Sequence, residues 1–371
     1  MKNVVDISCF SSGKRLEMRV FDGLRGGVRL TGQTVDGYGR HHAYIYALWS
    51  NVRERGRESC IRFVLLFVIA SLIISCSRPN AAKQVCFTFD DLPLAHNIDS
   101  FSYVQTFTKL VNRLKANNIP AIGFVNESKL FSNDSLIQWR YDLIKLWVSS
   151  GLQLGNHTYS HPDYTKVSLK EYAKDIEKGA RVTKHLMTNE SGYYYFRHPF
   201  LRVGDSKEKA DSLSNYLESN NYKVAPVTID HDEYIFANAY RISVMNQDSI
   251  MTEKIKNDYL VYMEQNILYF ETLTKKVFGR NINQILLLHN NQLNADYMDD
   301  LIKLFKSHDY KFSSLYDALN DPVYQTPINY YVGRGPSWVE RWAKSKNVPD
   351  DYFNDDPSVP EYIISYIEIT R

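Results

Sequence analysis

The chain has 371 residues, of which 44% are hydrophobic and 23% charged, and these proportions are typical of a globular protein with a sizeable core. Its formal net charge of +2, without a long basic stretch, argues against a nucleic-acid partner. All cysteines lie in the first quarter of the chain, so the sequence does not indicate a disulfide framework that spans the fold.

An apolar run at residues 63–74 follows several arginines and ends shortly before Cys76. The run is short for a membrane span, and its layout is that of a signal peptide. The Ile-Ile-Ser-Cys ending resembles a bacterial lipobox, which implies cleavage before Cys76 and lipidation of its thiol. We therefore expect a lipoprotein-type signal peptide at residues 59–76 and a polar tether at 77–84. The alternative is a plain membrane anchor with an incidental cysteine.

Residues 1–58 are rich in Gly and Arg and lack a sustained apolar period. A signal peptide belongs at the extreme N-terminus. We therefore expect residues 1–58 to be absent from the mature protein, as an overextended start or an unstructured segment. The lipid anchor would place the protein in the cell envelope, held to a bacterial membrane on the periplasmic side or at the cell surface. No protein partner is implied.

Strand and helix patterns alternate about seven times over residues 85–319. Apolar runs predict strands at 85–89, 120–125, 152–155, 193–196, 222–229, 284–288 and 310–313. Helical periodicity predicts helices at 101–117, 135–150, 168–187, 206–219, 253–278 and 295–308. This alternation predicts an α/β domain with a mostly parallel sheet, either a barrel or a doubly wound sheet. Residues 320–371 are expected to form an irregular C-terminal wrap on this domain, with a substrate lid as the alternative.

The most informative stretch is the apolar strand that ends at Asp90 and Asp91, just before Pro93. Neighbouring strand residues point to opposite faces, but at a strand end both carboxylates can reach one cavity. One of them can then hold a cation while the other acts as a base. An ordinary turn that closes a strand is the alternative.

His157 and His161 follow another predicted strand and are four residues apart. On one helical turn, this spacing points two imidazoles in the same direction and suits two nitrogen ligands on one metal. Together with Asp91 they would form a site of two histidines and one carboxylate, with positions left for water and substrate. Zinc is the default metal for such ligands, and cobalt, nickel or iron would also fit.

Two further residues follow predicted strands. Arg197 can form a bidentate pair with a carboxylate, and if it holds Asp90, that acid stays ionised and away from the metal. His289 ends a buried strand and is expected to point into the same cavity as a proton donor. The alternatives are a salt bridge at the rim for Arg197 and a satisfied core histidine for His289.

Taken together, these residues resemble the polysaccharide deacetylases of the NodB-homology group, carbohydrate esterase family 4. The resemblance covers roughly residues 85–319 and is carried by four motifs in family order. They are Thr-Phe-Asp-Asp at 88–91, His-Thr-x-x-His at 157–161, Arg-x-Pro-Phe at 197–200 and Leu-x-His at 287–289. The family fold implied is a distorted (β/α) barrel of about seven parallel strands.

The resemblance implies a role for each matching residue. Asp90 becomes the general base and His289 the general acid, while Arg197 positions Asp90. Asp91, His157 and His161 become the metal ligands. Leu92, Pro199 and Phe200 become candidate oxyanion or substrate contacts, with the side chain of Leu92 near the sugar site.

The fourth family motif, Asp-x-x-Asp-Trp, is matched only approximately. Asp230 is followed here by Glu233 and Tyr234. In the family this region supports the acid histidine. The candidates for that support are Asp230, Asp232 and Glu233, and the sequence does not choose among them.

The function implied is metal-dependent removal of acetyl groups, N-acetyl or O-acetyl, from a cell-envelope or extracellular polysaccharide. A sugar-binding lipoprotein without activity and another metal-dependent amidohydrolase remain alternatives. An iron-dependent oxygenase with the same ligands is disfavoured, because such sites usually occupy a double-stranded β-helix rather than alternating strands and helices.

Overall fold

The computed structural model describes residues 5–6, 19–20, 82–96, 98–189 and 192–369. The chain divides into two compact units, Met1–Pro79 and Asn80–Arg371. In the first unit, β1 (Val5–Asp6) pairs antiparallel with β2 (Arg19–Val20). The predicted signal peptide and Cys76 lie outside the described residues. Within the described part of the chain, no helix combines the length and apolar character needed to cross a membrane.

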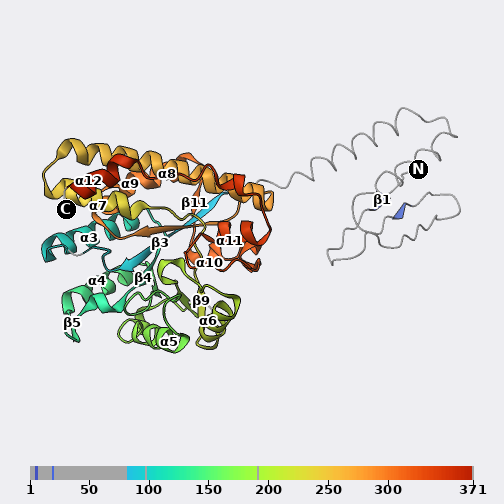
Figure 1. Cartoon of the computed structure of the whole chain (residues 1–371), viewed down its shortest axis with the longest axis horizontal. Coiled ribbons are helices and arrows are strands. Elements are labelled where there is room, and N and C mark those ends of the chain that lie inside the picture. The colour runs from blue at the N-terminus through green and yellow to red at the C-terminus, as the bar shows by residue number, and fades with distance from the viewer. Residues whose placement is uncertain (1–4, 7–18, 21–81, 97, 190–191, 370–371) are drawn as a thin grey trace. The chain divides into compact units, whose positions relative to one another are not determined.

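The second unit is built on a sheet of seven parallel strands, in the order β10-β3-β4-β7-β8-β9 with β11 beside the start of β3 (Figure 1). The strands are β3 (Gln84–Leu92), β4 (Ile122–Val125), β7 (Gln153–Asn156), β8 (Tyr194–Phe196), β9 (Tyr222–Val224), β10 (Gln284–His289) and β11 (Lys311–Phe312). Most residues of the central strands β3, β4 and β10 are buried, which is typical of parallel strands. The expected parallel α/β domain is confirmed.

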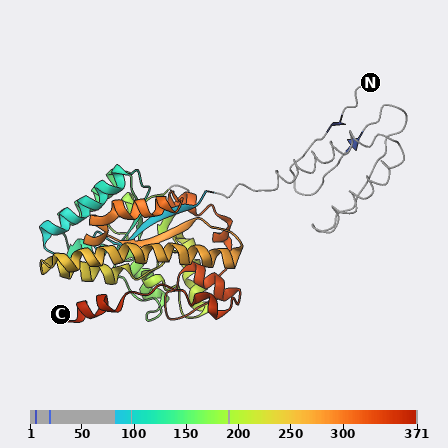
Figure 2. The same ribbon diagram turned by 90° about the horizontal axis from the view of Figure 1, so that it is seen from above.

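The helices are α3 (Ser100–Ala116), α4 (Gln138–Ser149), α5 (Leu169–Lys178), α6 (Lys207–Ser219), α7 (Glu233–Met245), α8 (Ser249–Phe278), α9 (Gln292–Ser307), α10 (Leu315–Ala318), α11 (Trp338–Ser345) and α12 (Glu361–Ile369). Helices α3, α7, α8, α9 and α12 pack against one another on one side of the domain, where α8 runs along its length (Figures 1 and 2). A capping box of Ser168 and Glu171 begins α5.

The sheet curls into a distorted barrel that an irregular segment completes. The strand expected at 222–229 is wrong beyond Val224, because Pro226 has no N–H to continue the ladder. The following residues cross to β10 instead. There the Thr228 N–H donates to Ile285 O over 2.9 Å, and the Leu287 N–H donates to Ile229 O over 3.1 Å.

Three other expected elements differ from the structure. The helix expected at 168–187 ends at Lys178, with Gly179 as its C-cap. Gly179 lies so close to Thr158 that an added Cβ would be 2.3 Å from the Thr158 carbonyl carbon. The helix expected from residue 135 begins at Gln138, after a short hairpin of β5 (Phe131–Ser132) and β6 (Ser135–Leu136). Residues 320–371 are not irregular throughout, since they contain α11 and α12.

Candidate active site

Strand β3 brings two carboxylates to the carboxyl end of the sheet. Asp90 is opposite His289 in the parallel ladder with β10. On the other side, the register with β4 shifts after Phe89, and Asp91 adopts a left-handed backbone with φ of 64°. This irregularity removes the alternation of faces. Both carboxylates consequently lie 3.7 Å from His157 Nε2, as expected for a strand end.

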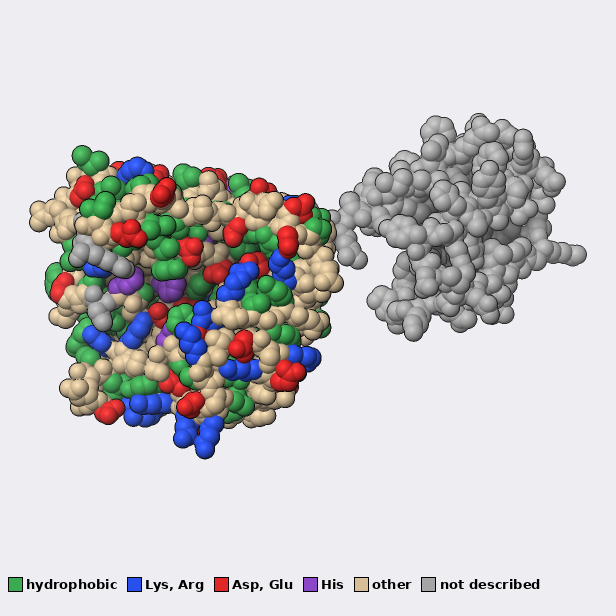
Figure 3. All heavy atoms as spheres, viewed as in Figure 1, with side chains coloured by type: hydrophobic (Ala, Val, Ile, Leu, Met, Phe, Trp, Pro, Cys, Tyr) green, Lys and Arg blue, Asp and Glu red, His purple; other side chains and the backbone are tan. Residues whose placement is uncertain are grey.

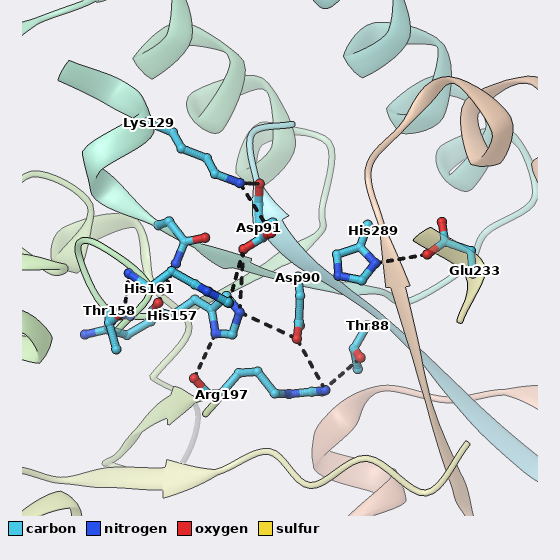
Figure 4. A network of polar contacts seen from close by, with 12 residues as sticks. Thr88, Asp90, Asp91, Lys129, His157, Thr158, His161, Arg197, Glu233 and His289 are labelled. Atoms are coloured by element: carbon cyan, nitrogen blue, oxygen red, sulfur yellow. Dashed lines mark hydrogen bonds and ion pairs between the residues drawn. The ribbon is translucent and has the colours of Figure 1, made fainter. Parts of the chain in front are cut away.

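Three candidate metal ligands come together at this point (Figure 4). Oδ1 of Asp91 is 3.7 Å from His157 Nε2 and 3.6 Å from His161 Nε2, and the ligand atoms of all three residues lie within 4.8 Å of one another. The expected helical turn is wrong, because residues 157–161 form a loop with left-handed backbones at Thr158 and His161. The loop nevertheless turns both imidazoles toward Asp91.

Neighbouring groups keep the candidate ligand atoms of these residues unprotonated and available to bind a cation. Nδ1 of His157 lies 2.8 Å from the carbonyl oxygen of Arg197, so it carries the proton and leaves the Nε2 lone pair toward Asp91. Burial lowers the pKa of both His157 and His161, which favours the neutral form that binds metal. Oδ1 of Asp91 is buried and lacks a hydrogen-bond partner among the described residues. The donor set therefore fits a divalent metal such as zinc.

Asp90 lies deeper than Asp91 and beside Arg197. Burial raises the pKa of Asp90 to about 6, although the Arg197 charge acts in the opposite direction. The expected bidentate pair is wrong in detail. Nη1 of Arg197 is 3.8 Å from Asp90 Oδ2, and Nη2 donates to Thr88 Oγ1 over 2.9 Å (Figure 4). Thr88 in turn donates to Leu286 O over 2.7 Å, so the guanidinium is tied to two neighbouring strands.

Of the three carboxylates considered as support for His289, Glu233 makes the contact. Its Oε2 lies 2.9 Å from His289 Nδ1. Burial alone would lower the pKa of His289, but the Glu233 hydrogen bond and charge outweigh it and raise the pKa to about 9. Asp230 accepts from the His231 N–H, and the Asp232 N–H donates to Tyr262 Oη.

Three residues around the site were missed by the sequence reasoning. Lys129 Nζ donates to Asp91 O over 3.0 Å and lies 3.5 Å from Asp91 Oδ2. Asn291 and Asn294 both donate to Glu233 Oε1. A single lysine after a strand carries no distinctive signal, whereas the asparagines that closely follow His289 could have been recognised as hydrogen-bonding partners.

The candidate substrate contacts divide into buried and exposed groups. The Leu92 side chain is fully buried and packs near Gly123, so its expected position near the sugar site is wrong. Pro199 is also buried. Phe200 is 51% exposed, and its ring centroid lies 4.3 Å from that of His161. On the face shown in Figure 3, histidine side chains gather in the hollowed part of the surface.

An Asp-His-His donor set beside a second carboxylate and a carboxylate-supported histidine, at the carboxyl ends of parallel strands, is typical of metal-dependent hydrolases. Residues 77–221 match the family model of the polysaccharide deacetylases. This match confirms the resemblance to the polysaccharide deacetylases that the motifs indicated.

Individual proteins and solved structures are similar to this chain over part of its length. The peptidoglycan-N-acetylglucosamine deacetylase of Bacillus cereus is 27% identical over 183 residues, which cover 47% of this chain and 57% of that protein. An uncharacterised 30.6 kDa protein of Geobacillus stearothermophilus is 26% identical over 255 residues, or 67% of this chain and 75% of that protein. Among solved structures, a carbohydrate esterase family 4 pseudoenzyme from Bacillus anthracis is 15% identical with a TM-score of 0.42, and the match covers 65% of this chain and 66% of that chain.

Proposed function

We propose that this protein is a metal-dependent deacetylase that hydrolyses N-acetyl groups of a cell-envelope or extracellular glycan, with O-acetyl groups as a second substrate class. The observation that carries the proposal is the meeting of Asp91, His157 and His161 beside Asp90 and the His289–Glu233 pair. The name of the Bacillus cereus relative favours an N-acetylglucosamine polymer as the substrate.

Asp91, His157 and His161 would hold the metal, with zinc preferred for this ligand set. A bound divalent metal would supply Lewis acidity toward the acetyl carbonyl and the attacking water. Asp90 accepts the proton of that water, and its raised pKa of about 6 suits a base that operates near neutral pH. Arg197 keeps this carboxylate oriented.

The second half of the reaction needs a donor, since an amine leaves poorly without a proton. His289 fits this role because Glu233 holds it in the protonated form. The proton passes from the imidazolium to the amine nitrogen as the bond between the acetyl carbon and that nitrogen breaks. The Leu92 N–H, which the resemblance offered for the oxyanion, belongs to the parallel pairing of Leu92 with Val125 between β3 and β4, so we assign it no part in the reaction.

Asp90→Asn tests the assignment of the base. This variant should bind zinc with unchanged stoichiometry and release acetate about a hundred- to ten-thousand-fold more slowly. Near-full activity would contradict the assigned role. The alternative of a sugar-binding protein without activity predicts that the wild-type protein binds zinc and glycan and releases no acetate.

We also propose that Cys76 carries a lipid anchor that holds the protein to a bacterial membrane in the cell envelope. The support is the apolar run at 63–74 and the lipobox-like ending before Cys76. Cells given a labelled fatty-acid analogue should label the wild-type protein and leave Cys76→Ala unlabelled. Equal labelling of the two proteins would refute the anchor.

A further inference from the structure

A C-terminal segment, residues 329–345, packs on two loops that shape the site. We call it the brace, and it lies outside the residues that the family model matches. Its Trp338 N–H donates to Val227 O over 2.7 Å, three residues before Asp230. The Trp338 ring stacks on His198 with 6.3 Å between centroids and 23° between planes. The brace therefore contacts the chain just after β8 and just after β9.

Arg341 ties the brace to the loop at residues 198–202. Its side chain is fully buried. Nη2 donates to Leu201 O over 2.9 Å, and Nη1 donates to Tyr330 O over 3.1 Å. The Arg341 guanidinium thus links two parts of the brace through Tyr330 and also holds the Leu201 carbonyl of the loop. A buried charge with two backbone acceptors is costly to displace, so this contact limits how far the loop can move.

Gly335 makes the closest approach between the brace and the loop. A Cβ added there would lie 1.7 Å from Phe200 O and 2.8 Å from the Phe200 carbonyl carbon. Both neighbours are backbone atoms, which cannot rotate away as a flexible side chain would. Gly333, two residues earlier, offers the opposite environment, because an added Cβ would meet no atom within 4 Å.

The loop needs external support because of its backbone. Phe200 and Leu201 are consecutive non-glycine residues with φ of 55° and 53°. Such conformations are sterically disfavoured for L-residues and persist where the surroundings fix them. The Arg341 hydrogen bond and the Gly335 contact are such surroundings.

This backbone sets the orientation of the Phe200 ring. The ring meets His161 at an interplanar angle of 70°, and the Arg202 guanidinium lies 5.3 Å from its centroid. With 51% of Phe200 exposed, part of the ring remains open to solvent beside a candidate metal ligand. An exposed aromatic ring in this position offers an apolar surface against which a sugar ring can pack.

We propose that the brace is part of the substrate site, with Gly335 and Arg341 as positioning residues that hold Phe200 against His161 for glycan binding. This inference rests on the proposed function. It assigns substrate positioning to residues 329–345, which come after the barrel strands in the chain and include none of the proposed metal ligands or proton-transfer residues.

Gly335→Ala tests the proposal, with Gly333→Ala as the matched control. In the full-length protein, Gly335→Ala should lower kcat/KM for an N-acetylated chito-oligosaccharide by about a hundredfold, the loss that a 1 Å misplacement can cause. Gly333→Ala should leave it unchanged. In a Phe200→Ala background, Gly335→Ala should add less than about twofold, because the group it displaces is already absent. Losses that multiply in the double variant would overturn the proposal.

Hydrogen exchange gives a readout that does not depend on activity. Peptides covering residues 198–204 should exchange faster in Gly335→Ala than in Gly333→Ala. Equal exchange rates in the two variants would overturn the proposal that the brace holds this loop. If the wild-type protein releases no acetate, the proposed function fails while this comparison still decides the structural claim. Should Gly335→Ala fail to fold, Arg341→Lys, which cannot make both backbone contacts, should show the same faster exchange, and wild-type exchange would count against the proposal.

Discussion

Replacing Glu233 by Gln tests how the proton on His289 is held. Glu233 is buried, and its Oε2 lies 2.9 Å from His289 Nδ1. The amide of Gln occupies the same space, and its oxygen can still accept from Asn291 and Asn294. The substitution therefore removes the negative charge with little change in packing. Burial of the imidazole, which lowers its pKa, remains in the variant.

The size of the effect follows from the two pKa values. In the wild-type protein the His289 pKa is raised to about 9, from an ordinary value of 6.5. Without the Glu233 charge we expect the pKa to return to about its ordinary value of 6.5. The protonated donor then persists to about pH 9 in the wild type and is lost above about pH 6.5 in the variant. At about pH 8 only ~3% of the variant would be protonated, so kcat/KM should be about thirtyfold lower, whereas near pH 6 the difference should be under about twofold.

The assay is acetate release from one acetylated glycan, with kcat/KM measured from about pH 5 to 10. Glu271→Gln is the control, because it neutralises another buried carboxylate. Glu271 lies on α8, where its Oε1 is 2.7 Å from Lys83 Nζ, and it takes no part in the proposed site. Its pH profile should match that of the wild type. A basic limb in Glu233→Gln that coincides with the wild-type limb would refute the assignment of His289 as a donor held by Glu233.

Three further substitutions test the supports of the site. Lys129→Met should weaken zinc affinity about ten- to a hundredfold, because Asp91 loses the group that orients it. A chelator competition measures this affinity, and wild-type affinity in the variant would contradict the role of Lys129. Arg197→Lys should retain zinc but lower kcat, since a lysine cannot contact Asp90 and Thr88 together, and an unchanged kcat would remove Arg197 from the mechanism. Trp147→Ala should cost about 3–5 kcal/mol of unfolding free energy in urea, because its fully buried ring packs on Phe89, and a loss below about 1 kcal/mol would show that the core adapts.

The sheet and most of the candidate site residues could be predicted because several strands give two sequence signals. An apolar run gives the strand, and the polar residue that follows gives its carboxyl end, as with Asp90, His157, Arg197 and His289. Since parallel strands end at one edge, the residues after separate strands could be expected to meet. The candidate metal ligands Asp91, His157 and His161 could be proposed by this reasoning and from their donor chemistry, and the structure brings them together.

Other features depend on backbone geometry that residue types do not specify. The spacing of His157 and His161 fits a helical turn and a loop equally well, and the loop arises from left-handed residues that have no sequence signal of their own. The direction of the Leu92 side chain depends on the register shift after Phe89. Lys129 acts largely through backbone carbonyls, which every residue has. The brace contacts the site through tertiary packing, and Gly335 in the sequence reads as an ordinary loop glycine.

The most direct test of the central claim is acetate release by the purified protein from a panel of acetylated glycans, measured after chelation and again after zinc is returned. The donor set of Asp91, His157 and His161 predicts that chelation abolishes release from at least one N-acetylated glycan and that zinc restores it. Stoichiometric zinc binding without release from any member of the panel would contradict the proposed deacetylase activity.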